Sequence, residues 1–268
     1  MPALPEIGCR HEERKPEDGS AARLLPAARF VLPSHTMFVI NTRPHPDSDI
    51  FAALVRSAGA VSVASPVMAI RYRDDPVAAG PGEALAFTSS NGVRAFARAS
   101  SARNHQVYAV GEATAEEARR AGFSAVAAAG GDVESLAELI TASKSTRPVL
   151  HLAGSDRAGD LVAALGARGV AARRLVIYDA VPVLDLSDET RRTLTSTPEK
   201  TAVALFSPRS AALFFAQIGR AGLEPSLKGA RLLALSDAVA AAALQERWGR
   251  ADIAKDRSVE AMAALLRS

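Results

Sequence analysis

The chain has 268 residues, of which 48% are hydrophobic and 23% charged, a composition typical of globular proteins and a length sufficient for two modest domains. Its formal net charge of +3 suits an acidic small-molecule ligand and is too small to favour nucleic acid as a partner. The one cysteine, Cys9, excludes a disulfide framework. The N-terminal tail has no apolar run of signal-peptide length, and no later segment is long enough to span a membrane, so we expect a cytoplasmic protein without membrane association.

Residues 1–36 are rich in Pro, Glu, Arg and Ala without a periodic pattern, and they carry as many acidic as basic side chains. This composition predicts a disordered tail that is neutral overall, which assigns the positive charge to the rest of the chain. Order is expected to begin at Met37. Met37 is then either the natural start, with the tail an over-extended reading frame, or the first ordered residue after an ordinary flexible extension.

From Met37 onward, short apolar runs of strand type alternate with segments of helical spacing. Such alternation predicts parallel sheets covered by helices on both faces. The predicted strands cover residues 37–43, 61–67, 85–88, 106–110, 125–129, 149–153, 172–183, 202–206, 231–235 and 252–254. The predicted helices cover residues 48–56, 91–99, 113–121, 133–143, 157–168, 188–195, 210–221, 237–247 and 258–267.

Three blocks of the first half recur in the second half in the same order and at nearly the same spacing. The strand–turn–helix segment 83–97 corresponds to 202–214, block 110–115 to 235–240, and block 133–140 to 259–266. Their identity is low, so the repeat is a statement about architecture. It predicts two similar α/β domains.

Two strand-to-helix turns, Ser89-Ser90-Asn91-Gly92 and Ser207-Pro208-Arg209-Ser210, are made of small polar residues. A helix that begins after such a turn presents unpaired N–H groups and the positive end of its dipole, which favour an anion. Each turn taken singly is more often a structural helix cap. Because the carboxyl ends of parallel strands meet at one edge of a sheet, the turns together predict a site for a polyanion. Other turns contribute Arg43, Gly111, Thr114, Gly154, Arg157 and Ser236.

The motifs of several common enzyme classes are missing. The chain has no phosphate-binding loop of the form GxxxxGK[ST], no GxGxxG after a strand and no GxSxG elbow. Its five histidines lack the spacing of metal ligands, so no metal site is predicted. Tyr178 lies in the predicted strand between the two halves and is either a half-buried hinge aromatic or a functional hydroxyl.

In an ordered set of short blocks, the chain resembles the uroporphyrinogen-III synthase family. Each block is weak alone because it consists of common small residues, but the set occurs in the family's order over residues 37–268. The blocks are Thr42-Arg43-Pro44, Phe87–Val93, Val110–Ala115, His151–Gly154, Ile177-Tyr178 and Phe206–Ala211.

The resemblance implies two flavodoxin-like α/β domains joined by a two-stranded connector. Residues 37–66 and 183–268 would form a discontinuous first domain, residues 70–175 the second domain, and residues 67–69 and 176–182 the connector. It also implies a lyase of tetrapyrrole biosynthesis, the route to haem, chlorophyll and cobalamin. Such an enzyme closes linear hydroxymethylbilane into a macrocycle, with loss of water and inversion of the last pyrrole ring through a spiro intermediate. No metal or organic cofactor is implied, and a monomer is expected.

The resemblance also implies roles for the polar turns and for Tyr178. Helix N-termini would hold the carboxylates of the linear tetrapyrrole, and Tyr178 would hydrogen-bond the departing hydroxyl or help its protonation. In the second half, Val239 stands where a hydroxyl is expected and Asp237 adds a negative charge, so the tightest carboxylate binding is expected at Ser89 to Gly92. The predicted substrate-binding residues are Arg43, Ser89, Ser90, Asn91, Gly92, Gly111, Thr114, Gly154, Arg157, Ser207, Pro208, Ser210 and Ser236.

Two other functions stay open at this point. A two-domain small-anion-binding protein of the periplasmic type would share the crossover connections, but it needs export and no signal segment precedes Met37. An inactive synthase-like regulator would keep the fold without the activity, and the unusual turn from Asp237 to Val239 is compatible with it. The isomer formed from fresh hydroxymethylbilane separates these functions.

Overall fold

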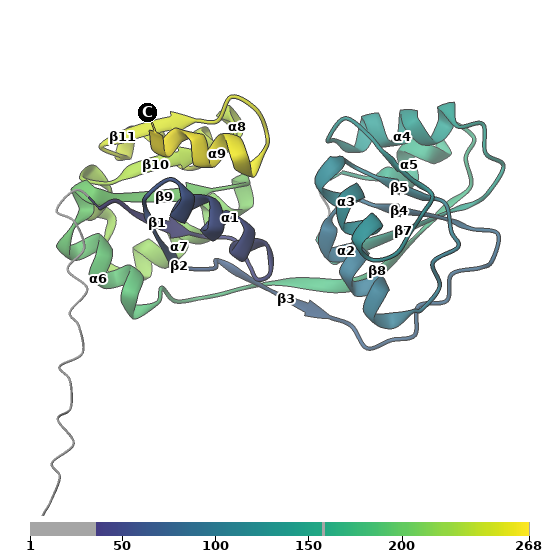
Figure 1. Ribbon diagram of the computed structural model, residues 1–268, viewed down its shortest axis with the longest axis horizontal. Helices are drawn as coiled ribbons and strands as arrows, with labels where there is room; N and C mark the ends of the chain where they lie inside the picture. Colours follow the sequence, from purple (N-terminus) through teal and green to yellow (C-terminus); the bar gives the residue numbers. More distant parts are fainter. Residues whose placement is uncertain (1–35, 157–158, 268) are drawn as a thin grey trace, which may run out of the picture. The chain divides into compact units, whose positions relative to one another are not determined.

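The computed structural model describes residues 36–156 and 159–267, which form two β-sheets with helices packed against each (Figure 1). The tail predicted to be disordered lies outside the described residues except for Thr36, and so does the predicted ligand residue Arg157. All strand pairs but one are parallel, which confirms the predicted fold class.

The first sheet, called sheet A here, has the strand order β11-β10-β9-β1-β2 and is parallel throughout. It combines the start and the end of the described chain, an order typical of flavodoxin-like folds. Its strands are β1 (Phe38–Asn41), β2 (Val61–Ala64), β9 (Thr201–Leu205), β10 (Arg231–Ala234) and β11 (Arg250–Ile253). Its helices are α1 (Asp47–Ser57), α6 (Asp188–Ser196), α7 (Pro208–Ala221), α8 (Asp237–Ala242) and α9 (Val259–Ala264), with 3-10 turns η1 (Pro198–Lys200), η2 (Glu224–Lys228), η3 (Gln245–Arg247) and η4 (Leu265–Arg267).

Sheet A is buried on both faces because alternate side chains of its strands point to opposite cores. On one face, Val39 packs with Phe51 of α1 and Met262 of α9. On the other face, Ile40 packs with Phe214 of α7 and other buried apolar residues. In Figure 1, α1 and α9 accordingly lie on one side of the sheet and α7 on the other.

The second sheet, called sheet B here, has the strand order β3-β8-β7-β4-β5-β6. Only the edge strand β3 is antiparallel, and it pairs with β8 from Met68 opposite Pro182 to Tyr72 opposite Tyr178. The strands are β3 (Met68–Tyr72), β4 (Ala84–Phe87), β5 (Val107–Ala109), β6 (Val126–Ala128), β7 (Val149–Gly154) and β8 (Ala172–Pro182). The helices are α2 (Ser90–Ala99), α3 (Glu112–Arg120), α4 (Val133–Ala142) and α5 (Leu161–Gly166).

Sheet B is also covered on both faces. Leu85 and Phe87 of β4 pack against Phe96 of α2, in a core that includes residues of α3. The alternate residues Ala84 and Ala86 pack into a core with residues of α4 and α5. The run of four buried residues in β4 therefore reads as continuously apolar in the sequence, as expected for a central parallel strand.

Several predicted boundaries differ from the observed ones. The helix predicted over 237–247 ends at Ala242, since Leu244 has a left-handed φ of 45° and Trp248 folds back to donate from Nε1 to the Ala243 carbonyl at 2.8 Å. Stacking of Trp248 on Phe214 stabilises this reversal. The strand predicted over 61–67 is shorter as well, because β2 ends at Ala64.

Among the described residues, no helix has both the length and the apolar character needed to cross a membrane.

Candidate active site

The turns that follow β4, β5 and β7 lie at one edge of sheet B, because these strands are parallel neighbours. They contain eight predicted site residues, Ser89, Ser90, Asn91, Gly92, Gly111, Thr114, Gly154 and Arg157, of which all but Arg157 are described. Two of these turns, those after β4 and β5, lead into helices of nine residues or more, so they bring two helix N-termini to this edge.

The turn after β4 begins with Ser89, the N-cap of α2. Its hydroxyl accepts a hydrogen bond from the Asn91 amide at 3.2 Å. The first turn of α2 has no acidic residue, so nothing there offsets the positive end of the dipole. Ser90 makes a long contact of 3.5 Å with the Ala113 carbonyl of the neighbouring turn.

Gly92 and Asn91 stabilise the same turn structurally. A Cβ at Gly92 would lie 2.8 Å from the Leu152 carbonyl, so the absent side chain allows α2 to approach β7 closely. The Asn91 side chain accepts a hydrogen bond from Arg94 at 2.9 Å and is buried. Both residues support the turn that carries Ser89.

Three predicted residues, Ser89, Gly154 and Tyr178, lie together in one cluster. Tyr178 of β8 is only 8% exposed, and the Ser89 side chain and the Gly154 backbone lie close enough to its phenol to influence its pKa. A Cβ at Gly154 would lie 2.7 Å from the Tyr178 ring, so glycine at this position makes room for the phenol. The three residues come from two strands and one helix cap that are distant in the sequence.

Burial raises the pKa of the Tyr178 phenol above its ordinary value, and the nearby Ser89 hydroxyl and Gly154 backbone offset only part of that rise. Tyr178 is therefore protonated at neutral pH. Such a phenol is a hydrogen-bond donor rather than a strong acid.

The turn after β5 supplies Gly111, the N-cap of α3, and Thr114 in the first helical turn. The Gly111 carbonyl accepts hydrogen bonds from the Thr114 and Ala115 amides at 3.1 and 3.0 Å. Thr114 is 5% exposed, and within the described residues its hydroxyl has no hydrogen-bond partner. That hydroxyl is available to a ligand at this edge.

In sheet A, Arg43 follows β1. Its guanidinium pairs with Asp47 at 3.2 Å and stacks on the Phe206 ring, with 4.8 Å from Cζ to the centroid. Its Nε is buried without a hydrogen-bond partner among the described residues. Arg43 is thus a partly compensated cation rather than a free one.

The turn after β9 is a reciprocal helix cap. The Ser207 hydroxyl accepts from the Ser210 amide at 3.0 Å, while the Ser210 hydroxyl accepts from the Ser207 amide at 2.9 Å. Pro208 occupies the first helical position, where its missing N–H has no cost. The hydrogen bonds of these two serine hydroxyls therefore stabilise the N-terminus of α7 itself.

The turn after β10 leads into α8, which has six residues, with Ser236 as N-cap. The Ser236 side chain makes no capping hydrogen bond, although its carbonyl accepts from the Val239 and Ala240 amides. Val239 is 2% exposed, so the position that lacks the expected hydroxyl packs into the core.

Two polar residues that the sequence did not single out, His151 and Thr88, lie beside the Ser89 turn. His151 is 5% exposed in β7, and its Nε2 lies 3.2 Å from the Thr88 hydroxyl. In the sequence, the histidine inside the otherwise apolar run Val-Leu-His-Leu-Ala could have indicated a buried polar residue at this strand.

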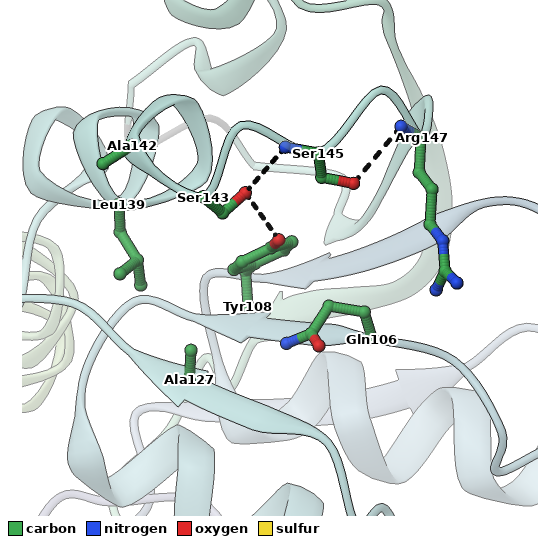
Figure 2. A pocket seen from close by; sticks show the side chains of 8 residues that line it. All are labelled: Gln106, Tyr108, Ala127, Leu139, Ala142, Ser143, Ser145 and Arg147. Atoms are coloured by element: carbon green, nitrogen blue, oxygen red, sulfur yellow. Dashed lines mark hydrogen bonds between the residues drawn. The ribbon is translucent and has the colours of Figure 1, made fainter.

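A cavity of about 630 Å³ lies elsewhere in sheet B (Figure 2). Gln106 and Arg147 in its lining precede β5 and β7, so the cavity lies at the amino ends of the strands, away from the polar turns. Tyr108 within it donates to the Ser143 hydroxyl at 2.9 Å. No group of three or more potential metal ligands occurs within residues 36–156 and 159–267.

Comparisons with known proteins agree on one family. The family model "Uroporphyrinogen-III synthase HemD" matches residues 49–264. A crystal structure of uroporphyrinogen-III synthetase from Helicobacter pylori is similar, with 20% identity, a TM-score of 0.60 and coverage of 86% of this chain and 97% of that one. A mutant uroporphyrinogen III synthase from the extremely thermophilic bacterium Thermus thermophilus gives 18% identity, a TM-score of 0.52 and coverage of 87% and 98%.

The search of curated proteins found no match. At these identities the solved structures establish the fold alone, and the family model carries the assignment. Because that model spans most of the sequence, the chain belongs to the uroporphyrinogen-III synthase family.

Proposed function

We propose that this protein converts linear hydroxymethylbilane into uroporphyrinogen III and that the polar turns hold the carboxylates of the substrate. The reaction is a dehydration with ring closure, in which the last pyrrole ring is inverted through a spiro intermediate. Family membership supports the reaction, and the geometry of the turns supports the assignment of residues.

The observation that carries the assignment is the cluster of Ser89, Gly154 and Tyr178 at the carboxyl edge of sheet B. A buried, protonated phenol lies there beside the N-terminus of α2, which has no acidic residue in its first turn. Carboxylates bind favourably at such helix ends. One edge therefore combines an anion site with a neutral hydrogen-bond donor.

Little acid–base machinery is needed for this chemistry. Loss of the hydroxyl from hydroxymethylbilane gives an electrophilic azafulvene, and the enzyme's main task is to fold the chain so that attack occurs at the substituted carbon. Tyr178 donates a hydrogen bond to the departing hydroxyl, while Ser89, Thr114 and the amides of α2 and α3 orient the carboxylates. The raised pKa of Tyr178 suits this donor role.

We further propose the domain boundaries given by the resemblance, with residues 37–66 and 183–268 around sheet A, residues 70–175 around sheet B, and a connector between them. The division of the strands supports this assignment, since sheet A takes its strands from both ends of the described chain. A cytoplasmic monomer completes the proposal.

Freshly generated hydroxymethylbilane is the decisive substrate. Oxidised products separated by chromatography are expected to contain the type III isomer when the protein is present and the symmetric type I isomer when it is absent. Type I alone in both reactions would refute the synthase activity and leave a non-enzymatic anion-binding role.

A further inference from the structure

His151 is a buried polar residue in a strand that is otherwise apolar. All six residues of β7 are buried, and His151 itself is 5% exposed. Its neighbours Leu150 and Leu152 point into the core that contains α2 residues, whereas Val149 points into the opposite core with residues of α4 and α5. By the alternation of a strand, His151 shares the face of Val149.

The imidazole has one partner in the described part of the chain. Nε2 lies 3.2 Å from Oγ1 of Thr88, while the buried Nδ1 has no hydrogen-bond partner there. Burial and the positive charge of Arg174 lower the pKa of His151 to about 4, although Asp160 opposes them. At neutral pH the ring is uncharged and carries a proton on one nitrogen only.

The two tautomers differ in what they leave unpaired. A proton on Nδ1 would bury an N–H donor without a partner, whereas a proton on Nε2 leaves only a bare acceptor at Nδ1. Orphaned buried donors are the rarer case in folded proteins. The environment therefore favours Nε2–H, which donates to the Thr88 oxygen.

The donation from His151 Nε2–H to Thr88 determines whether the Thr88 hydroxyl can itself act as a hydrogen-bond donor. Thr88 directly precedes Ser89 at the carboxyl end of β4 and is half-buried. If its oxygen accepts from His151, its own proton stays available to another acceptor at this edge. The opposite tautomer would consume that proton inside the protein.

We propose that His151 is a positioning residue, whose Nε2–H donates to Thr88 and keeps the Thr88 hydroxyl as a donor to a substrate carboxylate. This inference rests on the proposed function and deepens it by adding a carboxylate contact beside the Ser89 turn. His151 itself does not touch the substrate.

The tautomer is measured directly by long-range ¹⁵N–¹H NMR on the ¹⁵N-histidine-labelled full chain, with His151→Gln to assign the signals. We expect the Nε2–H form at neutral pH. The Nδ1–H form would overturn the inference whatever the enzyme's activity.

Kinetics test whether His151 acts through Thr88. His151→Met and the isosteric Thr88→Val should each raise KM for hydroxymethylbilane about tenfold with kcat nearly unchanged, the size expected for one hydrogen bond to a carboxylate. The double variant should be no worse than Thr88→Val alone. His151→Gln, whose Nε2 can still donate, should restore part of the loss.

His105 offers the matched control. It is 4% exposed, its Nδ1 lies 2.9 Å from the Glu83 carbonyl, and it precedes β5 at the opposite end of the strands. His105→Met should leave KM unchanged even where it lowers the melting temperature.

Two kinetic results would also contradict the inference. The first is a full additional KM increase from His151→Met in the Thr88→Val background. The second is no KM change in any of these variants while the wild-type protein makes the type III isomer. A wild-type protein that makes only type I refutes the proposed function instead, and the NMR result still decides the tautomer.

Discussion

The turns at Ser89 and Ser207 are the instructive pair in this molecule. Both follow a buried central strand, and in both a serine caps a helix of ten residues or more. At Ser207, the hydroxyls of Ser207 and Ser210 each accept a hydrogen bond from the backbone amide of the other residue, at the start of α7. At Ser89, the hydroxyl accepts a hydrogen bond from one local amide, and it also lies near the buried phenol of Tyr178, whose pKa it influences.

This difference distinguishes a turn that only caps a helix, at Ser207, from a turn that we propose to bind substrate, at Ser89. A reciprocal cap satisfies the helix end with its own residues, so it contributes chiefly to stability. A cap that shares its hydroxyl with a distant buried phenol is coupled to the rest of the sheet edge. We therefore propose that these two segments of similar sequence have different functions, and we expect substitutions at Ser89 to affect catalysis and substitutions at Ser207 to affect stability.

The largest effect is expected from crowding Tyr178. In Gly154→Ala, the new Cβ would lie 2.7 Å from the ring, so the phenol must move away from Ser89. The displaced ring also disturbs the Ser89 turn, and a substrate held about 1 Å out of place loses about 100-fold in kcat/KM. Gly249→Ala is the control in sheet A, because its Cβ would lie 2.6 Å from the Lys228 carbonyl. Gly249 directly precedes β11, so it lies at the amino ends of the strands of sheet A, whereas the polar turns follow their carboxyl ends. Steady-state kinetics with hydroxymethylbilane should show the loss only in Gly154→Ala, and equal losses would refute the special position of this edge.

Acidification should weaken sheet B through His151. The pKa of His151 is about 4 in the fold, below its ordinary 6.5, so between these values the unfolded chain binds more protons and stability falls as pH falls. From pH 7 to pH 5 the contribution is about 2 kcal/mol. Urea unfolding at both pH values measures it, and His151→Met should remove this part of the pH dependence. An identical pH dependence in His151→Met would contradict the burial argument.

Thr114 in α3 and Val239 in α8 occupy corresponding positions, so exchanging the residue types compares the two helix ends directly. Thr114→Val removes a hydroxyl that has no other partner in the described chain and should raise KM about tenfold. Val239→Thr places a hydroxyl at the corresponding buried position of sheet A, where it should lower the free energy of unfolding by about 1–2 kcal/mol and leave KM unchanged. A lower KM in Val239→Thr would show that the turn in sheet A binds substrate as well.

The smallest effect is expected from Tyr178→Phe, which keeps the ring and removes one hydrogen bond. Because the raised pKa makes Tyr178 a donor rather than a strong acid, kcat should fall only about fivefold. Rapid-quench kinetics of product formation measure it. A loss of three orders of magnitude would instead make Tyr178 an essential general acid.

The alternation of strands and helices was predictable because parallel strands buried on both faces, such as β4 and β9, are continuous apolar runs. The end of α8 was not, since it depends on Trp248 packing against Phe214 across a turn. The candidate site likewise has one part that the sequence predicts and one part that depends on tertiary contacts. Turns with Ser89 or Ser207 are visible in the sequence, but the contacts that distinguish them, from Tyr178 and within the reciprocal cap, come from tertiary structure.

The most direct test compares Ser89→Ala with Ser207→Ala, using fresh hydroxymethylbilane and measuring the fraction of the type III isomer. We expect Ser89→Ala to lose control of the ring closure and to give a mixture of the type III and type I isomers. Ser207→Ala should still give type III and lose only about 1 kcal/mol of stability, the usual cost of a lost helix cap. Loss of isomer control in Ser207→Ala, with control retained in Ser89→Ala, would contradict the central claim that the edge of sheet B directs the reaction.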